Sequence, residues 1–226
     1  MTLIYAGKTK DLMEDKDGNT YFHFKDDVTG KDGVFDPGEN QVGATIAGSG
    51  HSNVVVSTYF FEKLEEKGIP THFISSNADD LTMHVKKAEV FGKGLEVICR
   101  YRAVGSFIRR YGLYAKAGDQ LDNYVEFTLK DDDRQDPLIN EDALVQLGIL
   151  KENEYATIKK LTQDISGVIK EELAKKDLEL YDIKLEFGRL AGSDTIVLID
   201  EVSGGNMRVY KGDESIHPLD LVHYFK

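Results

Sequence analysis

Residues 180–187 read Leu-Tyr-Asp-Ile-Lys-Leu-Glu-Phe, and charged and apolar side chains alternate along this stretch. Alternation with a period of two is typical of a β-strand that is buried on one face. Residues 195–199 read Thr-Ile-Val-Leu-Ile and form a second apolar segment, with 188–194 as the connection. We therefore predict a β-hairpin whose first strand presents three charged side chains on one face. These are Asp182, Lys184 and Glu186.

Outward from this hairpin, the chain reads as short strands and two helices. Residues 52–67 carry apolar side chains at helical spacing, and Gly68 and Pro70 end the helix. Residues 150–176 form the longest predicted helix, with one apolar stripe. Strands that come first, with helices inserted later, indicate an α+β (or α/β) fold with a domain boundary near 80–90. Further strands are predicted at 3–5, 71–74, 95–99 and 124–129.

The composition limits the kinds of protein that fit. The chain has 226 residues and a formal net charge of −12, from 28 Lys and Arg against 40 Asp and Glu. This acid excess argues against a nucleic-acid partner bound through a broad basic face. The chain has no run of about 18 apolar residues and no signal-peptide pattern. Cys99 is the only cysteine, so no disulfide forms within the chain. We expect a cytoplasmic protein without membrane or nucleic-acid partners.

Positive charge is concentrated in two places. Lys8 and Lys10 follow a glycine at a predicted turn between two strands. Two lysines separated by one residue on a strand point the same way, so this pair could clamp nucleotide phosphates. A pair of solvated surface lysines is the alternative.

From Arg100 to Arg110 four arginines occur without an acidic residue, around Ser106. Guanidinium and hydroxyl groups together bind a phosphomonoester. A basic helix face that balances the acidic surface is the alternative here.

Carboxylates follow two of the predicted strands. Asp200 and Glu201 end the second strand of the hairpin. Carboxylates that converge there with those of the first strand form a site for Mg²⁺ and a nucleotide. Residues 130–137 (Lys-Asp-Asp-Asp-Arg-Gln-Asp-Pro) follow the predicted strand 124–129. They suit Mg²⁺ as well, with a solvated acidic turn as the alternative.

Together these motifs resemble the SAICAR synthetase family over residues 3–210. The stretch 96–106 matches the family's signature of a glutamate, an arginine and a Gly-Ser pair, and 182–188 matches its D-x-K-x-E-F-G pattern. Supporting matches are Gly7-Lys8-Thr9-Lys10, Lys130 with Asp136-Pro137, and Asp200-Glu201 with Arg208.

The resemblance implies both an architecture and a reaction. It implies an α+β fold with an antiparallel, β-rich ATP-binding lobe at 1–85. A larger mixed α/β lobe at 86–226 would carry the ribonucleotide-phosphate and magnesium sites, with the ATP cleft between the lobes. The implied enzyme is an ATP-dependent ligase of purine biosynthesis that uses ATP and Mg²⁺. It would join the carboxylate of carboxyaminoimidazole ribonucleotide, a phosphoribosyl substrate, to the amine of L-aspartate through an acyl phosphate.

The resemblance also implies roles for particular residues. The catalytic residues would be Lys184, Asp182 and Asp32. ATP would be bound by Lys8, Lys10, Lys130, Glu186 and Asp200. The substrate phosphate would be bound by Arg100, Ser106 and Arg208, and Mg²⁺ by Glu186, Asp200 and Asp136.

The chain departs from the family's pattern in three places. Gly204-Gly205 replaces a Pro-Asp pair, and Lys31 enters the glycine-rich motif 29–33. The family's distal arginine falls near His223, and the last helix is missing, so we expect a divergent, C-terminally short member. These departures leave two alternatives: a paralogous ATP-dependent amide ligase with another acceptor or amine, or an inactive nucleotide-binding homologue. A homodimer is a further expectation.

Overall fold

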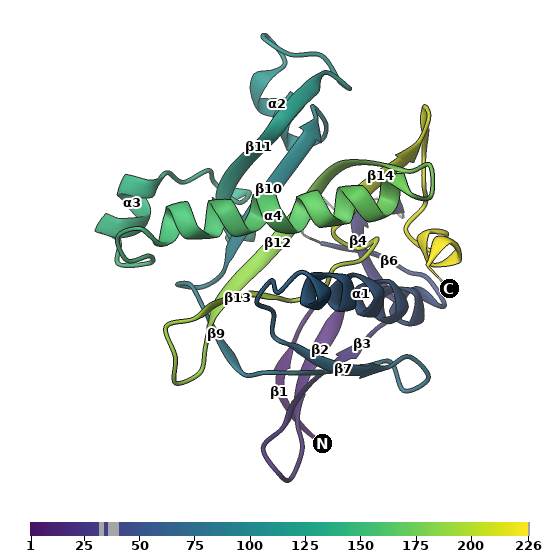
Figure 1. Cartoon of the computed structure of the whole chain (residues 1–226), viewed down its shortest axis with the longest axis vertical. Coiled ribbons are helices and arrows are strands. Elements are labelled where there is room, and N and C mark those ends of the chain that lie inside the picture. Colours follow the sequence, from purple (N-terminus) through teal and green to yellow (C-terminus); the bar gives the residue numbers. More distant parts are fainter. Residues whose placement is uncertain (32–33, 36–40, 226) are drawn as a thin grey trace. The chain divides into compact units, whose positions relative to one another are not determined.

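The computed structural model describes residues 1–31, 34–35 and 41–225, and the chain divides into two units (Figure 1). Unit 1 comprises Met1–Lys87, Glu201–Met207 and Ser215–Lys226, and unit 2 comprises Ala88–Asp200 and Arg208–Glu214. The first boundary lies close to the predicted one at 85/86. The predicted second domain, 86–226, nevertheless differs from unit 2, because two C-terminal segments belong to unit 1.

Unit 1 is built on an antiparallel sheet in the order β1-β2-β3-β8-β7. Its strands are β1 (Thr2–Ala6), β2 (Lys10–Glu14), β3 (Thr20–Phe24), β7 (Phe73–Asn77) and β8 (Thr82–Val85). A smaller sheet has the order β5-β4-β6, with β4 (Asp27–Lys31), β5 (Val34–Phe35) and β6 (Val42–Thr45). Residues 15–19 turn between β2 and β3, and the Asp15 N–H donates to Asn19 O at 3.0 Å.

The long helix of unit 1, α1 (Ser49–Glu66), begins three residues before the predicted start and buries Val54, Phe60, Phe61 and Leu64. The C-terminal segment packs on this helix through η2 (Leu221–Tyr224) and the residue after it. The Phe225 ring lies 4.6 Å from that of Tyr59 and 5.0 Å from that of Phe60, between centroids. This aromatic packing explains why the end of the chain belongs to unit 1.

Unit 2 contains a seven-stranded sheet with the path β11-β10-β12-β14-β15, and β9 and β13 also pair with β12. The strands are β9 (Ala88–Val90), β10 (Leu95–Arg102), β11 (Gln120–Leu129), β12 (Glu179–Leu190), β13 (Ile196–Ile199), β14 (Met207–Lys211) and β15 (Glu214–Ser215). β12 and β13 pair antiparallel, with Phe187 opposite Leu198. The predicted hairpin is therefore confirmed.

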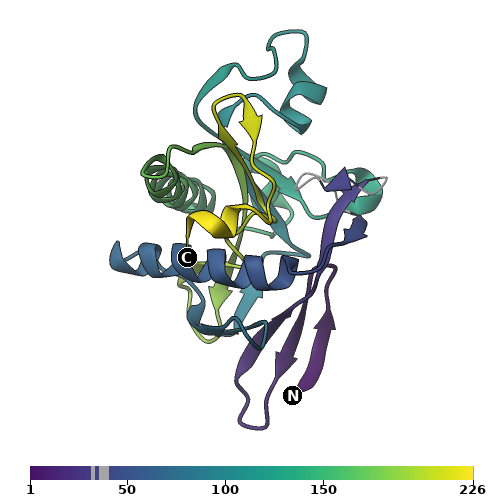
Figure 2. The ribbon, with the colours of Figure 1, turned by 90° about the vertical axis from the view of Figure 1, so that its right-hand side faces the viewer.

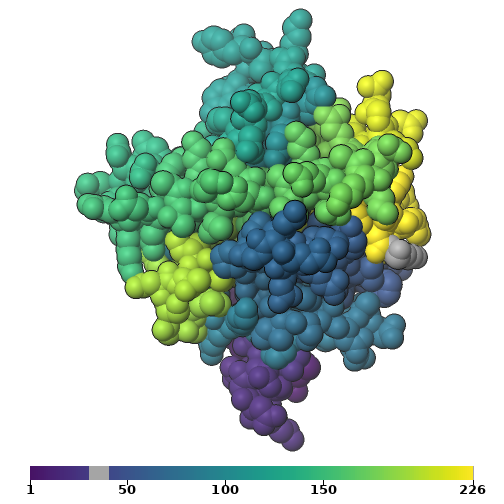
Figure 3. Space-filling view, viewed as in Figure 1, coloured from purple at the N-terminus to yellow at the C-terminus, as the bar shows by residue number. Residues whose placement is uncertain are grey.

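The helix α4 (Glu154–Ala174) packs on β10, β11 and β12 with its apolar stripe. Its buried side chains include Ile158, Ile165, Ile169 and Leu173. Figure 2 views α4 nearly along its axis beside the sheet, and the space-filling view shows it as a continuous green band (Figure 3). Shorter helical segments are α2 (Ser106–Tyr111), η1 (Asp132–Arg134) and α3 (Glu141–Gln146). Among the described residues, no helix is both long and apolar enough to cross a bilayer.

Cys99 lies on β10 beside Ser166 of α4 and is fully buried. Its Sγ donates a hydrogen bond to Asn123 Oδ1 at 2.9 Å. Burial raises the pKa of the Cys99 thiol to about 11, so the thiol stays protonated at about pH 8. We expect the folded protein to be unreactive toward a disulfide reagent such as DTNB at that pH. The thiol should titrate fully after unfolding in guanidinium chloride, and rapid labelling before unfolding would contradict this burial.

Candidate active site

One face of the unit 2 sheet carries charged side chains in three rows. Across β11, β10 and β12, the register gives the rows Tyr124, Arg100 and Asp182; Glu126, Ile98 and Lys184; and Thr128, Glu96 and Glu186. Alternate residues of a strand point to the same side of a sheet, so these nine share one face. Cys99, next to Arg100, points instead toward α4. The predicted sharing of one face by the three charged residues of β12 therefore holds.

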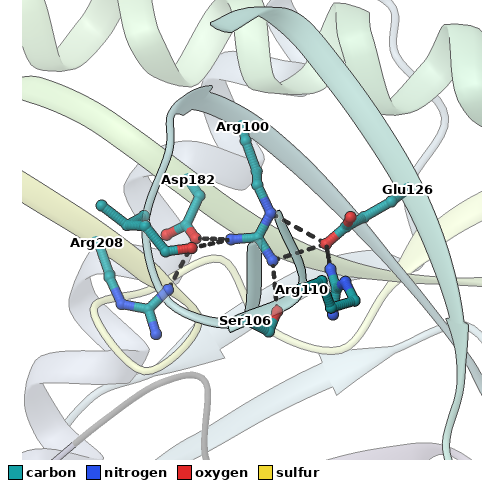
Figure 4. A network of polar contacts seen from close by, with 7 residues as sticks. Arg100, Ser106, Arg110, Glu126, Asp182 and Arg208 are labelled. Atoms are coloured by element: carbon teal, nitrogen blue, oxygen red, sulfur yellow. Dashed lines mark hydrogen bonds and ion pairs between the residues drawn. The ribbon is translucent and has the colours of Figure 1, made fainter. Parts of the chain in front are cut away.

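A network of arginines and carboxylates is centred on Arg100 of the first row (Figure 4). Arg100 is 2 % exposed, and its Nη1 donates to Asp182 Oδ2 at 2.5 Å. Its Nη2 donates to Ser106 Oγ at 2.9 Å. Arg208 Nη1 donates to the same Asp182 oxygen at 2.8 Å. The structure thus brings together the three residues predicted to bind the substrate phosphate, and it places the predicted catalytic Asp182 between two of them.

Two further members of this network are absent from the predicted set of site residues. Glu126 Oε1 accepts hydrogen bonds from Arg100 Nη2 at 2.7 Å and from Arg110 Nη2 at 2.5 Å. The sequence contains a feature that could have pointed to each of these two residues. Arg110 belongs to the run of basic residues, and Glu126 is an acidic residue inside the predicted strand 124–129.

A second cluster spans the second and third rows. Lys130 Nζ forms an ion pair with Glu186 Oε1 at 2.7 Å, and Lys184 Nζ forms one with Glu96 Oε1 at 3.0 Å. Burial, and then the charge of Asp200, raise the pKa of the Glu186 carboxyl. Burial lowers the pKa of Lys130, but the charges of Glu186 and Asp200 outweigh it, so that pKa is raised overall. The carboxylates of Glu186, Asp200 and Glu96 therefore all act on the Lys130 ammonium group.

These carboxylates fit a magnesium ion. Mg²⁺ takes oxygen ligands and is commonly held by one or two carboxylates together with substrate phosphates. Repulsion between Glu186 and Asp200 is the kind of charge excess that a divalent cation relieves. Within the described residues, no three His, Cys, Asp or Glu side chains are placed so that they could hold one metal ion together. Asp136 therefore does not join Glu186 and Asp200 as a third ligand. Asp136 Oδ1 instead accepts from the Asp131 backbone N–H at 2.8 Å.

The predicted lysine pair lies in unit 1, and the predicted turn between two strands is confirmed there. The Gly7 N–H donates to Lys10 O at 3.0 Å, so the chain turns here, with Lys8 exposed in the turn and Lys10 at the start of β2. Lys10 Nζ forms an ion pair with the buried Glu201 Oε1 at 2.6 Å. The predicted catalytic Asp32 lies outside the described residues.

The pair Gly204-Gly205 has a steric basis within unit 1. A Cβ on Gly204 would lie 2.7 Å from Pro218 Cα, closer than real Cβ contacts occur. A Cβ on Gly205 would lie 3.1 Å from Ser203 Oγ and 3.3 Å from Glu201 Oε2. The first position therefore admits only glycine, and the second faces polar side chains.

An α+β protein with arginines, lysines and carboxylates on one sheet face has the groups that binding of a phosphorylated small molecule requires. The family model of SAICAR synthetase matches residues 3–220. The chain belongs to the SAICAR synthetase family.

Individual relatives agree with this assignment. The phosphoribosylaminoimidazole-succinocarboxamide synthase of Clostridium tetani is 61% identical over 221 residues, which cover 98% of this chain and 97% of the relative. The crystal structure of the synthase from Ehrlichia chaffeensis has 31% identity and a TM-score of 0.82, covering 93% of this chain and 86% of that one. A SAICAR synthetase in complex with ADP has 33% identity and a TM-score of 0.82, covering 98% and 89%. The predicted α+β fold is confirmed.

Proposed function

We propose that this chain is the ATP-dependent ligase that joins carboxyaminoimidazole ribonucleotide to L-aspartate. The supporting observation is the arrangement of the two clusters on one sheet face. Four residues along a strand separate the row of Arg100 from the row of Glu96, which is about 13 Å. That spacing suits a substrate with a phosphate at one end and a carboxylate near ATP at the other.

At the first cluster, the substrate phosphate would be held by the groups around Arg100. Ser106 Oγ accepts from Arg100, so its own hydrogen remains to donate to a phosphate oxygen. Arg208 adds a second guanidinium, oriented by its bond to Asp182. Charge-assisted hydrogen bonds of this kind are short and strong. Anchoring the phosphate would fix the position of the reacting carboxylate farther along the face.

At the second cluster, the reaction would proceed in two displacements. A carboxylate oxygen of the ribonucleotide attacks the γ-phosphorus of ATP, and ADP leaves, so that an acyl phosphate forms. The amine of aspartate then attacks the acyl carbon, loses a proton, and inorganic phosphate leaves. Lys130 would stabilise the transferring phosphoryl oxygens, and Lys184 would face the substrate carboxylate. Bound Mg²⁺, held by Glu186 and Asp200, would neutralise phosphate charge.

The remaining predicted roles are part of the same proposal. Lys8 and Lys10 would contact nucleotide phosphates, and Asp32 would contribute to catalysis. The relative with ADP supports nucleotide binding by the family. A cytoplasmic location and a homodimer stay predictions.

The test is turnover with the complete substrate mixture. We expect purified protein with ATP, Mg²⁺, carboxyaminoimidazole ribonucleotide and L-aspartate to release ADP and phosphate in step with the amide product, measured by coupled absorbance and mass spectrometry. Succinate is the matched control, because it has both carboxylates of aspartate and no amine. Turnover with a different amine or acceptor would favour the paralogous ligase, to which Gly204-Gly205 points. ATP binding without turnover on any acceptor would favour the inactive homologue.

A further inference from the structure

All hydrogen-bond donors of the Arg100 guanidinium group are already bonded to acceptors within the protein. A guanidinium group has five N–H donors. Nε and one hydrogen of Nη2 bond to Glu126 Oε1, and the other hydrogen of Nη2 bonds to Ser106 Oγ. Nη1 bonds to Asp182 Oδ2 and to the Val104 carbonyl. An incoming phosphate can therefore bond to Arg100 only by displacing one of these acceptors.

Arg110 is the contrasting member of the network. Its side chain is 27% exposed. Within the described part of the chain, its one hydrogen bond runs from Nη2 to Glu126 Oε1, while its guanidinium also lies over the Tyr111 ring. Its other N–H groups are thus available to a ligand. Arg110 combines a fixed position in the network with donors that solvent can reach.

Glu126 is the group that orders both arginines. Its side chain is 2% exposed, and its Oε1 accepts from Arg100 twice and from Arg110 once. Burial of a carboxylate is costly unless cations pair with it, and both arginines pair with this one. Glu126 pairs with Arg100 and Arg110, and Asp182 pairs with Arg100 and Arg208, so the two carboxylates hold three guanidinium groups close together (Figure 4).

We propose that Arg110 is a further residue that binds the substrate phosphate, and that Glu126 is the positioning residue that holds Arg110 in register with Arg100. This inference rests on the proposed function for the identity of the substrate. The phosphate group would contact Arg110 and the Ser106 hydroxyl, while Arg100 supplies charge and orientation from behind. Asp182 plays for Arg208 the part that Glu126 plays for Arg110.

The test compares Arg110→Gln with Arg109→Gln. Arg109 is the exposed neighbour on α2 and lies outside the network, so its variant is the matched control. For Arg110→Gln we expect the KM for the ribonucleotide to rise about 10-fold or more while kcat and the KM for ATP stay within about 3-fold, as for the loss of uniform binding. Arg109→Gln should leave all three unchanged. Equal effects of the two variants on the ribonucleotide KM would overturn the assignment.

Glu126→Gln tests the positioning role. It removes the charge that orders both arginines while keeping the side-chain size, so it should raise the same KM selectively. If this variant fails to fold, Arg110→Gln still decides the question, because its side chain is partly exposed. Titration with ribose 5-phosphate, followed by NMR, separates this inference from the function. Binding by the wild-type protein that weakens in Arg110→Gln supports the phosphate site even without turnover, and unaltered binding overturns it.

Discussion

Replacing Asp200 by asparagine is expected to lower ATP-dependent turnover by about 1,000-fold, with the fold retained. The Asp200 backbone has φ of 69°, a conformation that asparagine adopts more readily than most residues. The substitution therefore keeps shape and backbone while removing one of the two charges proposed to hold Mg²⁺. It also removes repulsion from Glu186, whose pKa should fall toward its ordinary value. Steady-state kinetics over a range of Mg²⁺ concentrations measures the effect.

Asp194→Asn is the matched control. Asp194 belongs to the same hairpin, but its side chain is 84% exposed and pairs with the exposed Lys151. An exposed pair of this kind contributes little to stability, so turnover and melting temperature should both stay near the wild-type values. If Asp200→Asn were as active as this control, the carboxylate would have no part in the reaction. If it lost cooperative unfolding, Asp200 would be a structural residue.

Replacing Gly105 by alanine should raise the KM for the ribonucleotide about 100-fold. Gly105 has φ of 56° and ψ of −132°, a region that only glycine occupies without strain. A Cβ there would lie 2.9 Å from both Nη1 and Nη2 of Arg208. Arg208 would have to move away from Asp182, which orients it. Kinetics with varied ribonucleotide at saturating ATP and aspartate measures the loss.

Gly118→Ala is the control that separates the effect of backbone strain from the effect of displacing Arg208. Gly118 also has a positive φ, of 86°, but a Cβ there meets nothing within 4 Å. Both variants should lose about 1–3 kcal/mol of unfolding free energy to backbone strain. Only Gly105→Ala should change the ribonucleotide KM. A similar rise in both would show that strain in this part of unit 2, and not the position of Arg208, controls binding.

Local sequence patterns predicted most helices and strands. They could not predict which side chains meet, because those contacts depend on packing between segments far apart in the sequence. The alternation of charged and apolar residues along β12 depends only on neighbours in the chain, so the hairpin and its charged face could be predicted. Glu126 could be placed on a strand, but its partners depend on the register of β11 with β10, which no local pattern encodes. The turn at residues 7–10 could be predicted locally, whereas the ion pair between Lys10 and Glu201 depends on long-range packing. The return of Phe225 to α1 joins residues far apart in sequence.

Unit 1 is built from segments at both ends of the chain, and this affects how the chain folds during synthesis. Ribosomes release the N-terminus first, and domains generally fold as units. Unit 1 includes Glu201–Met207 and Ser215–Lys226, and the Val202 N–H donates to Ser57 Oγ of α1 at 3.2 Å. The apolar surface of α1 around Phe60 therefore stays uncovered until the last residues emerge. Unit 1 contains the first residues to be synthesised, but its hydrophobic core is complete only when the C-terminal segment has been added.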